Sequence, residues 1–92
     1  MITIEDVKEL FRPEVQGKVR NLVRYCPKYA KIDLGKYYLE FSYKGRKNLL
    51  FTFYLTAKEE GDDFHFGATD TDVADCWDKL IGRMVWEAMF KI

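Results

Sequence analysis

Apolar residues near the start of the chain recur at the spacing of two short helices. Thr3 and Asp6 form a Thr-x-x-Asp start signal ahead of the first helix. Pro13 would interrupt the hydrogen-bond ladder inside a helix but suits the first turn of a new one, so a second helix is expected from Pro13 to about Tyr25. The two apolar stripes are Ile4, Val7, Leu10 and Phe11, then Val15, Val19, Leu22, Val23 and Cys26.

From Tyr37 the period of the apolar positions changes to two, which predicts β-strands. The alternation runs to Tyr43, stops at residues 44–46 and resumes from Leu49 to Leu55, as expected for a hairpin. A three-residue loop keeps both apolar sets on one face, whereas a two-residue loop does not. The expected pairs are Phe41 with Leu49, Leu39 with Phe51 and Tyr37 with Phe53.

The end of the chain predicts one more strand and a long helix. A charged turn, Ala57 to Asp63, precedes a short third strand from Phe64 to Phe66. Thr69 and Asp70 are suitable helix caps, and helical periodicity then continues from Thr71 to Phe90. The stripe expected to pack on the sheet is Val73, Trp77, Leu80, Ile81, Met84 and Ala88.

These elements predict a single α+β domain over residues 1–92. The expected architecture is a three-stranded antiparallel meander with the helices packed on one face, in the order α-α-β-β-β-α. The sheet positions expected to face the helices are Leu39, Phe41, Leu49, Phe51, Phe53, Phe64 and Phe66.

The composition is typical of a folded cytoplasmic domain. Hydrophobic residues make up 48% of the 92 residues, enough for a modest core. No apolar run approaches the roughly 20 residues that cross a bilayer, and Met1 to Phe11 has acidic residues where a signal peptide has a basic start and an apolar stretch. Cys26 and Cys76 form no CxxC pair that would indicate a disulfide framework or a thiolate metal site. We therefore expect reduced thiols, no metal and no membrane partner.

The last helix carries two tryptophans that face opposite ways. Trp86 follows Trp77 by nine residues, a rotation of about 180° on a helix. Val85, Met89 and Phe90 lie beside Trp86, so the final turns have a second apolar surface. Because Trp, Phe and Met are typical of interface hot spots, we expect a protein interface here. The alternative is that the first helix folds back and covers this surface.

Nucleic-acid binding is a second hypothesis, based on charge and on the open sheet face. Residues 1–56 hold 11 Lys and Arg against 6 Asp and Glu, a net of +5, whereas residues 57–92 hold 4 against 9, a net of −5. Aromatic side chains on an open sheet face can stack nucleobases. Candidate contacts are Arg20 and Arg24 on the second helix, Lys44, Arg46 and Lys47 at the hairpin tip, and Tyr38 and Tyr54 on the open face.

The order of helix, three-strand meander and helix over residues 13–90 resembles that of double-stranded RNA-binding domains. In that family a lysine cluster opens the final helix and holds phosphates. Here the helix opens with Asp70, Thr71, Asp72, Val73, Ala74 and Asp75, whose carboxylates repel a phosphate backbone. The resemblance is therefore one of topology.

No residue pattern indicates catalysis. His65 is the only histidine, and the pattern places no serine or cysteine beside it. Asp70, Asp72 and Asp75 lack the glycine and the final glutamate of a calcium loop, so helix capping explains them better. The glycines are dispersed and form no phosphate-binding loop. We therefore expect a protein that is not an enzyme and has no cofactor.

These observations favour a small binding protein of the inhibitor or adaptor type. The expected partner is another protein, or a second copy of the chain in a homodimer. Small size and an aromatic content of 16% are common among the inhibitors and adaptors that phages and mobile elements encode. A viral origin is therefore a further expectation, by analogy.

Overall fold

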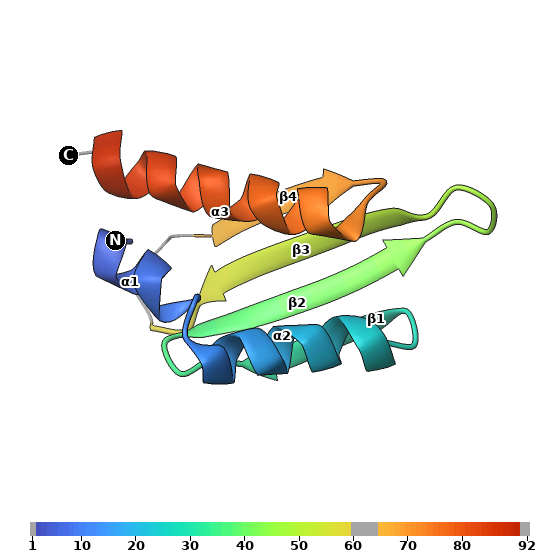
Figure 1. Cartoon of the computed structure of the whole chain (residues 1–92), viewed down its shortest axis with the longest axis horizontal. Helices are drawn as coiled ribbons and strands as arrows, with labels where there is room; N and C mark the ends of the chain where they lie inside the picture. Colours follow the sequence, from blue (N-terminus) through green and yellow to red (C-terminus); the bar gives the residue numbers. More distant parts are fainter. Residues whose placement is uncertain (1, 60–64, 91–92) are drawn as a thin grey trace.

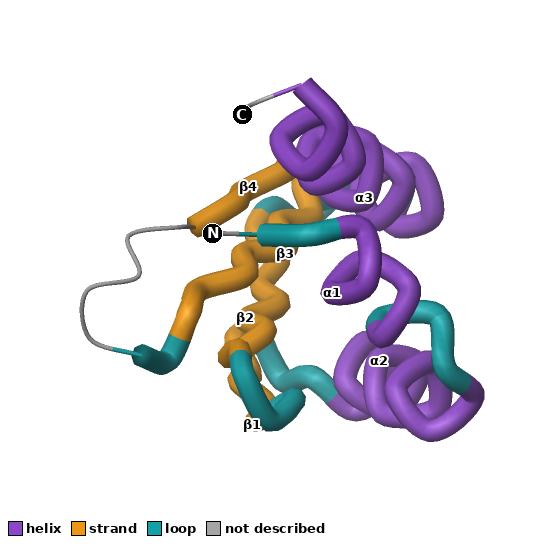
Figure 2. The backbone as a smooth tube through the Cα atoms, turned by 90° about the vertical axis from the view of Figure 1, so that its left-hand side faces the viewer, coloured by secondary structure: helices purple, strands orange, loops and turns teal. Residues whose placement is uncertain are grey.

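The computed structural model describes residues 2–59 and 65–90, which form a helical layer on one face of an antiparallel sheet (Figure 1). In chain order the elements are α1 (Ile4–Glu9), α2 (Pro13–Tyr25), β1 (Tyr29–Asp33), β2 (Tyr37–Lys44), β3 (Leu50–Ala57), β4 (His65–Asp70) and α3 (Val73–Phe90). Figure 2 shows the three helices on the same side of the sheet, as the sequence predicts. Among the described residues, no helix is long and apolar enough to cross a membrane.

The sheet has four strands, so the prediction of three was wrong. The meander was predicted correctly, since the strands lie in the order β1-β2-β3-β4 and all pair antiparallel. The missed strand is β1, which pairs with β2 along its whole length. The element order is therefore α-α-β-β-β-β-α, which departs from the three-strand order of double-stranded RNA-binding domains.

The hairpin register also differs from the prediction. Phe41 lies opposite Phe53, and Leu39 lies opposite Leu55, because the loop between β2 and β3 has five residues, 45–49. The predicted pairing is shifted by four residues, an even number, so each side chain still faces the predicted side. Leu49 is an exception, because it lies in the loop and is exposed.

The predictions for the third strand and its turn are only partly covered by the described residues. Phe64 and residues 60–63 of the charged turn lie outside them. The strand continues beyond its predicted end, so Thr69 and Asp70 belong to β4 instead of capping the helix. The α3 helix begins at Val73, and the Asp72 carboxylate accepts a hydrogen bond from the Asp75 backbone N–H at 3.0 Å.

The start of α1 is held by the predicted Thr-x-x-Asp signal. The Asp6 backbone N–H donates to the Thr3 hydroxyl at 3.2 Å, and the Thr3 N–H donates to the Asp6 carboxylate at 3.0 Å. Burial alone would raise the pKa of Asp6, but these hydrogen bonds, another from Tyr37 and the charge of Lys36 hold it below its usual value. The Lys36 ammonium lies 3.5 Å from the carboxylate and so links α1 to the start of β2.

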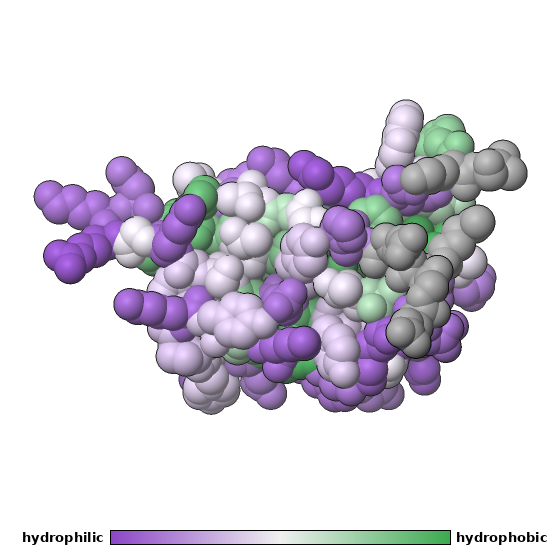
Figure 3. All heavy atoms as spheres, turned by 180° about the vertical axis from the view of Figure 1, so that it is seen from behind, coloured by the Kyte–Doolittle hydropathy of each residue, from purple (hydrophilic) through white to green (hydrophobic). Residues whose placement is uncertain are grey.

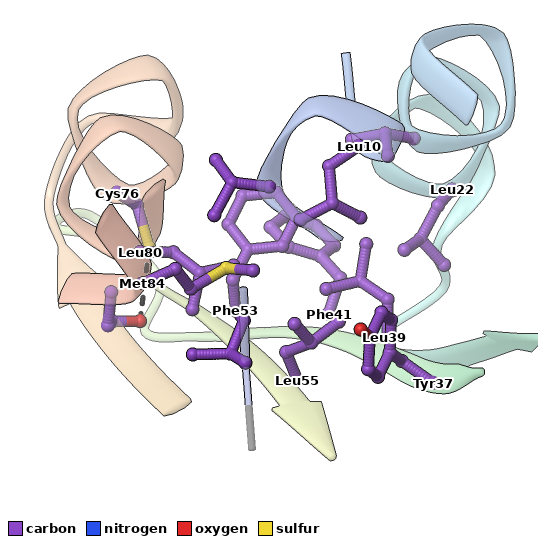
Figure 4. Packing of buried hydrophobic residues seen from close by; sticks show 14 of the residues in the cluster. Leu10, Leu22, Tyr37, Leu39, Phe41, Phe53, Leu55, Cys76, Leu80 and Met84 are labelled. Carbon is purple, nitrogen blue, oxygen red and sulfur yellow. Dashed lines mark hydrogen bonds between the residues drawn. The ribbon is translucent and has the colours of Figure 1, made fainter. Parts of the chain in front are cut away.

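The core lies between the sheet and the helices (Figure 4). Phe41 and Phe53 meet at its centre with their rings 4.8 Å apart, and Trp77 of α3 contacts Phe53 edge-on at 5.2 Å. The residues with the least exposed side chains come from every layer: Leu10, Leu39, Phe41, Phe53, Leu55, Cys76, Leu80 and Met84.

Candidate functional site

The C-terminal half of α3 presents different residues to the core and to the outside. Cys76, Leu80 and Met84 follow one another at intervals of four and are fully buried against the sheet. Trp86 follows Met84 by two residues, a rotation of about 200°, and therefore faces away from the core. Its side chain is 63% exposed, whereas that of Trp77 is half-buried against Phe53.

The exposed side of this helix end carries a compact apolar cluster. Trp86, Met89 and Phe90 are each more than half exposed, at 63%, 56% and 62%. The rings of Trp86 and Phe90, one turn apart, lie with their centroids 4.5 Å from each other. Val85 is half-buried and packs against the core. These four residues are called the α3 patch below.

The N-terminal helix packs beside α3 without covering the α3 patch. Figure 2 shows α1 between α3 and α2 in the helical layer, and α1 contacts α3. This packing buries Val7, while Leu10 just after the helix is also buried. Trp86 nevertheless stays exposed. The alternative that α1 covers the second apolar surface of the last helix was therefore wrong.

The open sheet face carries Tyr38 and Tyr54, as the sequence predicts, and Figure 3 views this face. Both rings already contact their neighbours. The Lys31 ammonium lies 4.1 Å from the centre of the Tyr38 ring, and that of Lys58 lies 4.9 Å from it. The Tyr54 ring stacks on His65 at 5.6 Å. The faces of these tyrosines are therefore partly occupied within the chain itself.

The other candidate nucleic-acid contacts lie on separate parts of the molecule. Arg20 and Arg24 are exposed on α2, which belongs to the helical layer and not to the open face. Lys44, Arg46 and Lys47 are exposed at the far end of the β2–β3 hairpin (Figure 1). The structure thus brings together the three tip cations but joins neither the α2 arginines nor the tyrosines to them.

The groups with catalytic or metal-binding potential are dispersed. Cys26 and Cys76 are buried, their thiols donate to backbone carbonyls, and burial raises the pKa of both. Asp70 accepts from the Lys79 ammonium at 2.6 Å, which lowers the pKa of Asp70. Among the residues that the structure describes, no three His, Cys, Asp or Glu side chains group closely enough to hold a metal ion.

A further surface was missed by the sequence reasoning because β1 was missed. An open groove of about 330 Å³ lies between α2 and β1, lined by residues that include Leu22, Tyr25, Ala30 and Ile32. The signal for this strand was present, since Ala30, Ile32 and Leu34 alternate with polar residues at a period of two.

Comparison of the chain with protein-family models, with curated proteins and with solved structures finds no match. The function must therefore be inferred from the residues and surfaces described above.

Proposed function

We propose that this chain is a non-catalytic binding protein, of the inhibitor or adaptor type, that docks on another protein through the α3 patch. The single observation that carries this proposal is the exposure of Trp86 together with Met89 and Phe90. Burying one such side chain contributes roughly 1.5–3 kcal/mol, so three adjacent ones supply a substantial driving force for association. Trp is also among the residue types enriched at interface hot spots.

The geometry of the patch also suits docking. Trp86 and Phe90 already contact each other in the free chain, with their ring centroids 4.5 Å apart. Rings that are held before binding lose less side-chain freedom when a partner arrives. Val85 supports the patch from beneath because it packs against the core. The patch is therefore supported by the folded domain and is not a loose chain end.

Trp86→Glu is expected to abolish docking while leaving the fold intact. The exposed side chain contributes little to the core, whereas a carboxylate in its place cannot be buried in an apolar interface without a large penalty. The affinity for the partner should fall by at least about 2 kcal/mol, or roughly thirtyfold. The measurements are solution mass by light scattering across a concentration series, and recovery of partners by affinity capture from the native host.

Trp77→Phe is the matched control, because it changes the other tryptophan of α3 and leaves the α3 patch unchanged. A wild-type dimer that only Trp86→Glu converts to a folded monomer would make the partner a second copy of the chain. Equal mass and equal partner recovery for Trp86→Glu and wild type would remove the α3 patch as the binding site. Unfolding of Trp86→Glu would place Trp86 in the core and would also contradict the proposal.

Nucleic-acid binding is a second candidate, favoured by the exposed hairpin tip. Lys44, Arg46 and Lys47 place three cations within four residues at the end of the molecule. A fluorescent RNA or DNA oligonucleotide should bind at low salt and dissociate steeply as salt rises, because each phosphate contact releases a counterion. Replacing Arg46 and Lys47 with glutamate should weaken binding by roughly tenfold or more, and Trp86→Glu should not. Absence of binding at low salt removes this candidate.

A further inference from the structure

The β1 strand is an edge of the sheet whose outer backbone groups have no strand to pair with among the described residues. The Tyr43 N–H donates to the Lys28 carbonyl at 3.1 Å, and the Leu34 N–H donates to the Tyr37 carbonyl at 2.8 Å. Lys28 and Leu34 therefore turn their backbone groups toward β2. Because the direction alternates along an antiparallel strand, every second residue between them points outward. The outward residues are Tyr29, Lys31 and Asp33.

The groove beside this edge is largely apolar. Leu22 and Tyr25 of α2 form one wall, and the half-buried side chains of Ala30 and Ile32 form the other. Figure 2 shows β1 and α2 along the same edge of the molecule. Tyr25 is 70% exposed, so the groove is open to solvent along the helix. A free strand edge and an apolar groove thus lie side by side.

This arrangement suits an extended peptide. A strand added to a sheet edge pairs its backbone with that edge, and pockets for alternate side chains give specificity. Residues of the added strand that lie opposite Ala30 and Ile32 would point into the groove. The residue opposite Lys31 would point to the open face of the sheet, beside the Lys31 ammonium. The expected side-chain pattern is therefore apolar, acidic, apolar.

The charge around the groove selects an acidic segment. Lys18 lines the groove, and the Arg24 guanidinium lies over the ring of Tyr25, another lining residue, at 5.4 Å from its centre. The two carboxylates of α2 and β1 already face cations: Glu14 lies 3.8 Å from the Arg12 guanidinium, and Asp33 lies 2.5 Å from the Lys58 ammonium. The remaining charge is positive and attracts an acidic partner. Lys28 and Lys31 are two further exposed cations, the first just before β1 and the second within it.

We propose that the β1 edge and the groove between α2 and β1 bind an extended acidic segment of a partner protein, which adds as a fifth strand of the sheet. This site is separate from the α3 patch, and neither proposal requires the other. The contact is small, so the expected dissociation constant is on the order of 10–100 µM. Such a segment would belong either to the protein that docks on the α3 patch or to a different partner protein.

The test is a fluorescence anisotropy titration with the fluorescein-labelled peptide Ser-Val-Glu-Val-Glu-Val-Ser. Binding should weaken as salt rises, because the attraction is between charges on the surface. The control peptide Ser-Val-Lys-Val-Lys-Val-Ser has the same β-propensity pattern with reversed charge and should bind at least roughly tenfold more weakly. Equal affinity for the two peptides, or no binding of the acidic one at low salt, would overturn the proposal.

Lys31→Pro separates the backbone contribution from that of charge. Proline at this position removes an N–H that points outward, so the hydrogen bonds between β1 and β2 stay intact. It should abolish peptide binding, whereas Lys31→Ala keeps the N–H, removes only the charge and should weaken binding by about threefold to tenfold. If the Lys31→Pro variant binds the peptide as tightly as the Lys31→Ala variant does, strand addition is contradicted.

Tyr25→Glu tests the groove without touching the sheet. Its side chain is exposed, so the fold should tolerate the change, and the new carboxylate should repel the acidic peptide and weaken binding roughly tenfold. Trp86→Glu should leave peptide binding unchanged. If Trp86→Glu loses peptide binding and Tyr25→Glu does not, the peptide binds at the α3 patch, which overturns this proposal.

The proposal is also overturned if the chain forms a dimer without peptide and Lys31→Pro converts that dimer to a monomer. The β1 edge would then bind a second copy of the chain.

Discussion

Phe53→Ala is expected to lower the free energy of unfolding by about 3–5 kcal/mol, because it removes a large buried ring and leaves a cavity. Phe53 lies on β3, one of the two inner strands, and is 1% exposed. Its ring centroid lies 4.8 Å from that of Phe41 and 5.2 Å from that of Trp77 of α3. The loss would therefore loosen the packing of α3 on the sheet as well as the sheet itself.

Chemical denaturation followed by circular dichroism measures this effect. Phe90→Ala is the matched control, since it removes the same ring from a position that is 62% exposed, and it should change stability by no more than about 0.5 kcal/mol. A domain of this size is stable by roughly 5–15 kcal/mol, so the difference between the two variants is a large part of the total. Similar losses for both would mean that Phe90 packs in the core, which would also argue against the α3 patch.

The helices and the faces of the sheet could be predicted from the sequence because hydrophobic periodicity reports which side of an element is buried. The geometry of about 100° per residue placed Trp86 opposite Trp77, and this is what the structure has. Whether α1 covers Trp86 could not be predicted, because that depends on how two helices separated by the whole sheet pack together. In the folded chain α1 contacts α3 but leaves Trp86 exposed.

The β1 strand was missed because its apolar side is weak. Ala30 and Ile32 are only half-buried, since the groove beside them is open, and Lys31 between them is charged and exposed. The groove that leaves Ala30 and Ile32 half-buried is also the groove that makes β1 a candidate docking edge.

The register was wrong because periodicity fixes only the face of each strand. Shifting the pairing of β2 with β3 by any even number of residues keeps Phe41 and Phe53 on the core side. The length of the loop therefore determines which of these registers forms. The five-residue loop allows Phe41 to meet Phe53 directly. Its first residue, Gly45, has a φ of +105°, a conformation that residues with a side chain rarely adopt.

Gly45→Ala is expected to lower the free energy of unfolding by about 2–4 kcal/mol. The left-handed conformation alone costs a residue with a Cβ roughly 1–2 kcal/mol. In addition, a Cβ at this position would lie 2.4 Å from the Asn48 carbonyl oxygen, so the loop backbone would have to move. Thermal or chemical unfolding measures the loss, and amide chemical shifts of Lys44 and Leu50 report whether the last pair of the hairpin opens.

Gly35→Ala is the matched control for this prediction, because the two glycines share the conformation but not the crowding. Gly35 has a φ of +97°, and nothing lies within 4 Å of the position its Cβ would take. It should therefore show only the conformational cost of about 1–2 kcal/mol. If Gly45→Ala loses more stability than Gly35→Ala, the extra loss comes from the close approach of Asn48. That contact would then help to select the five-residue loop. Equal losses would mean that the loop relaxes freely, and the register would then have to be selected by the meeting of Phe41 and Phe53 in the core.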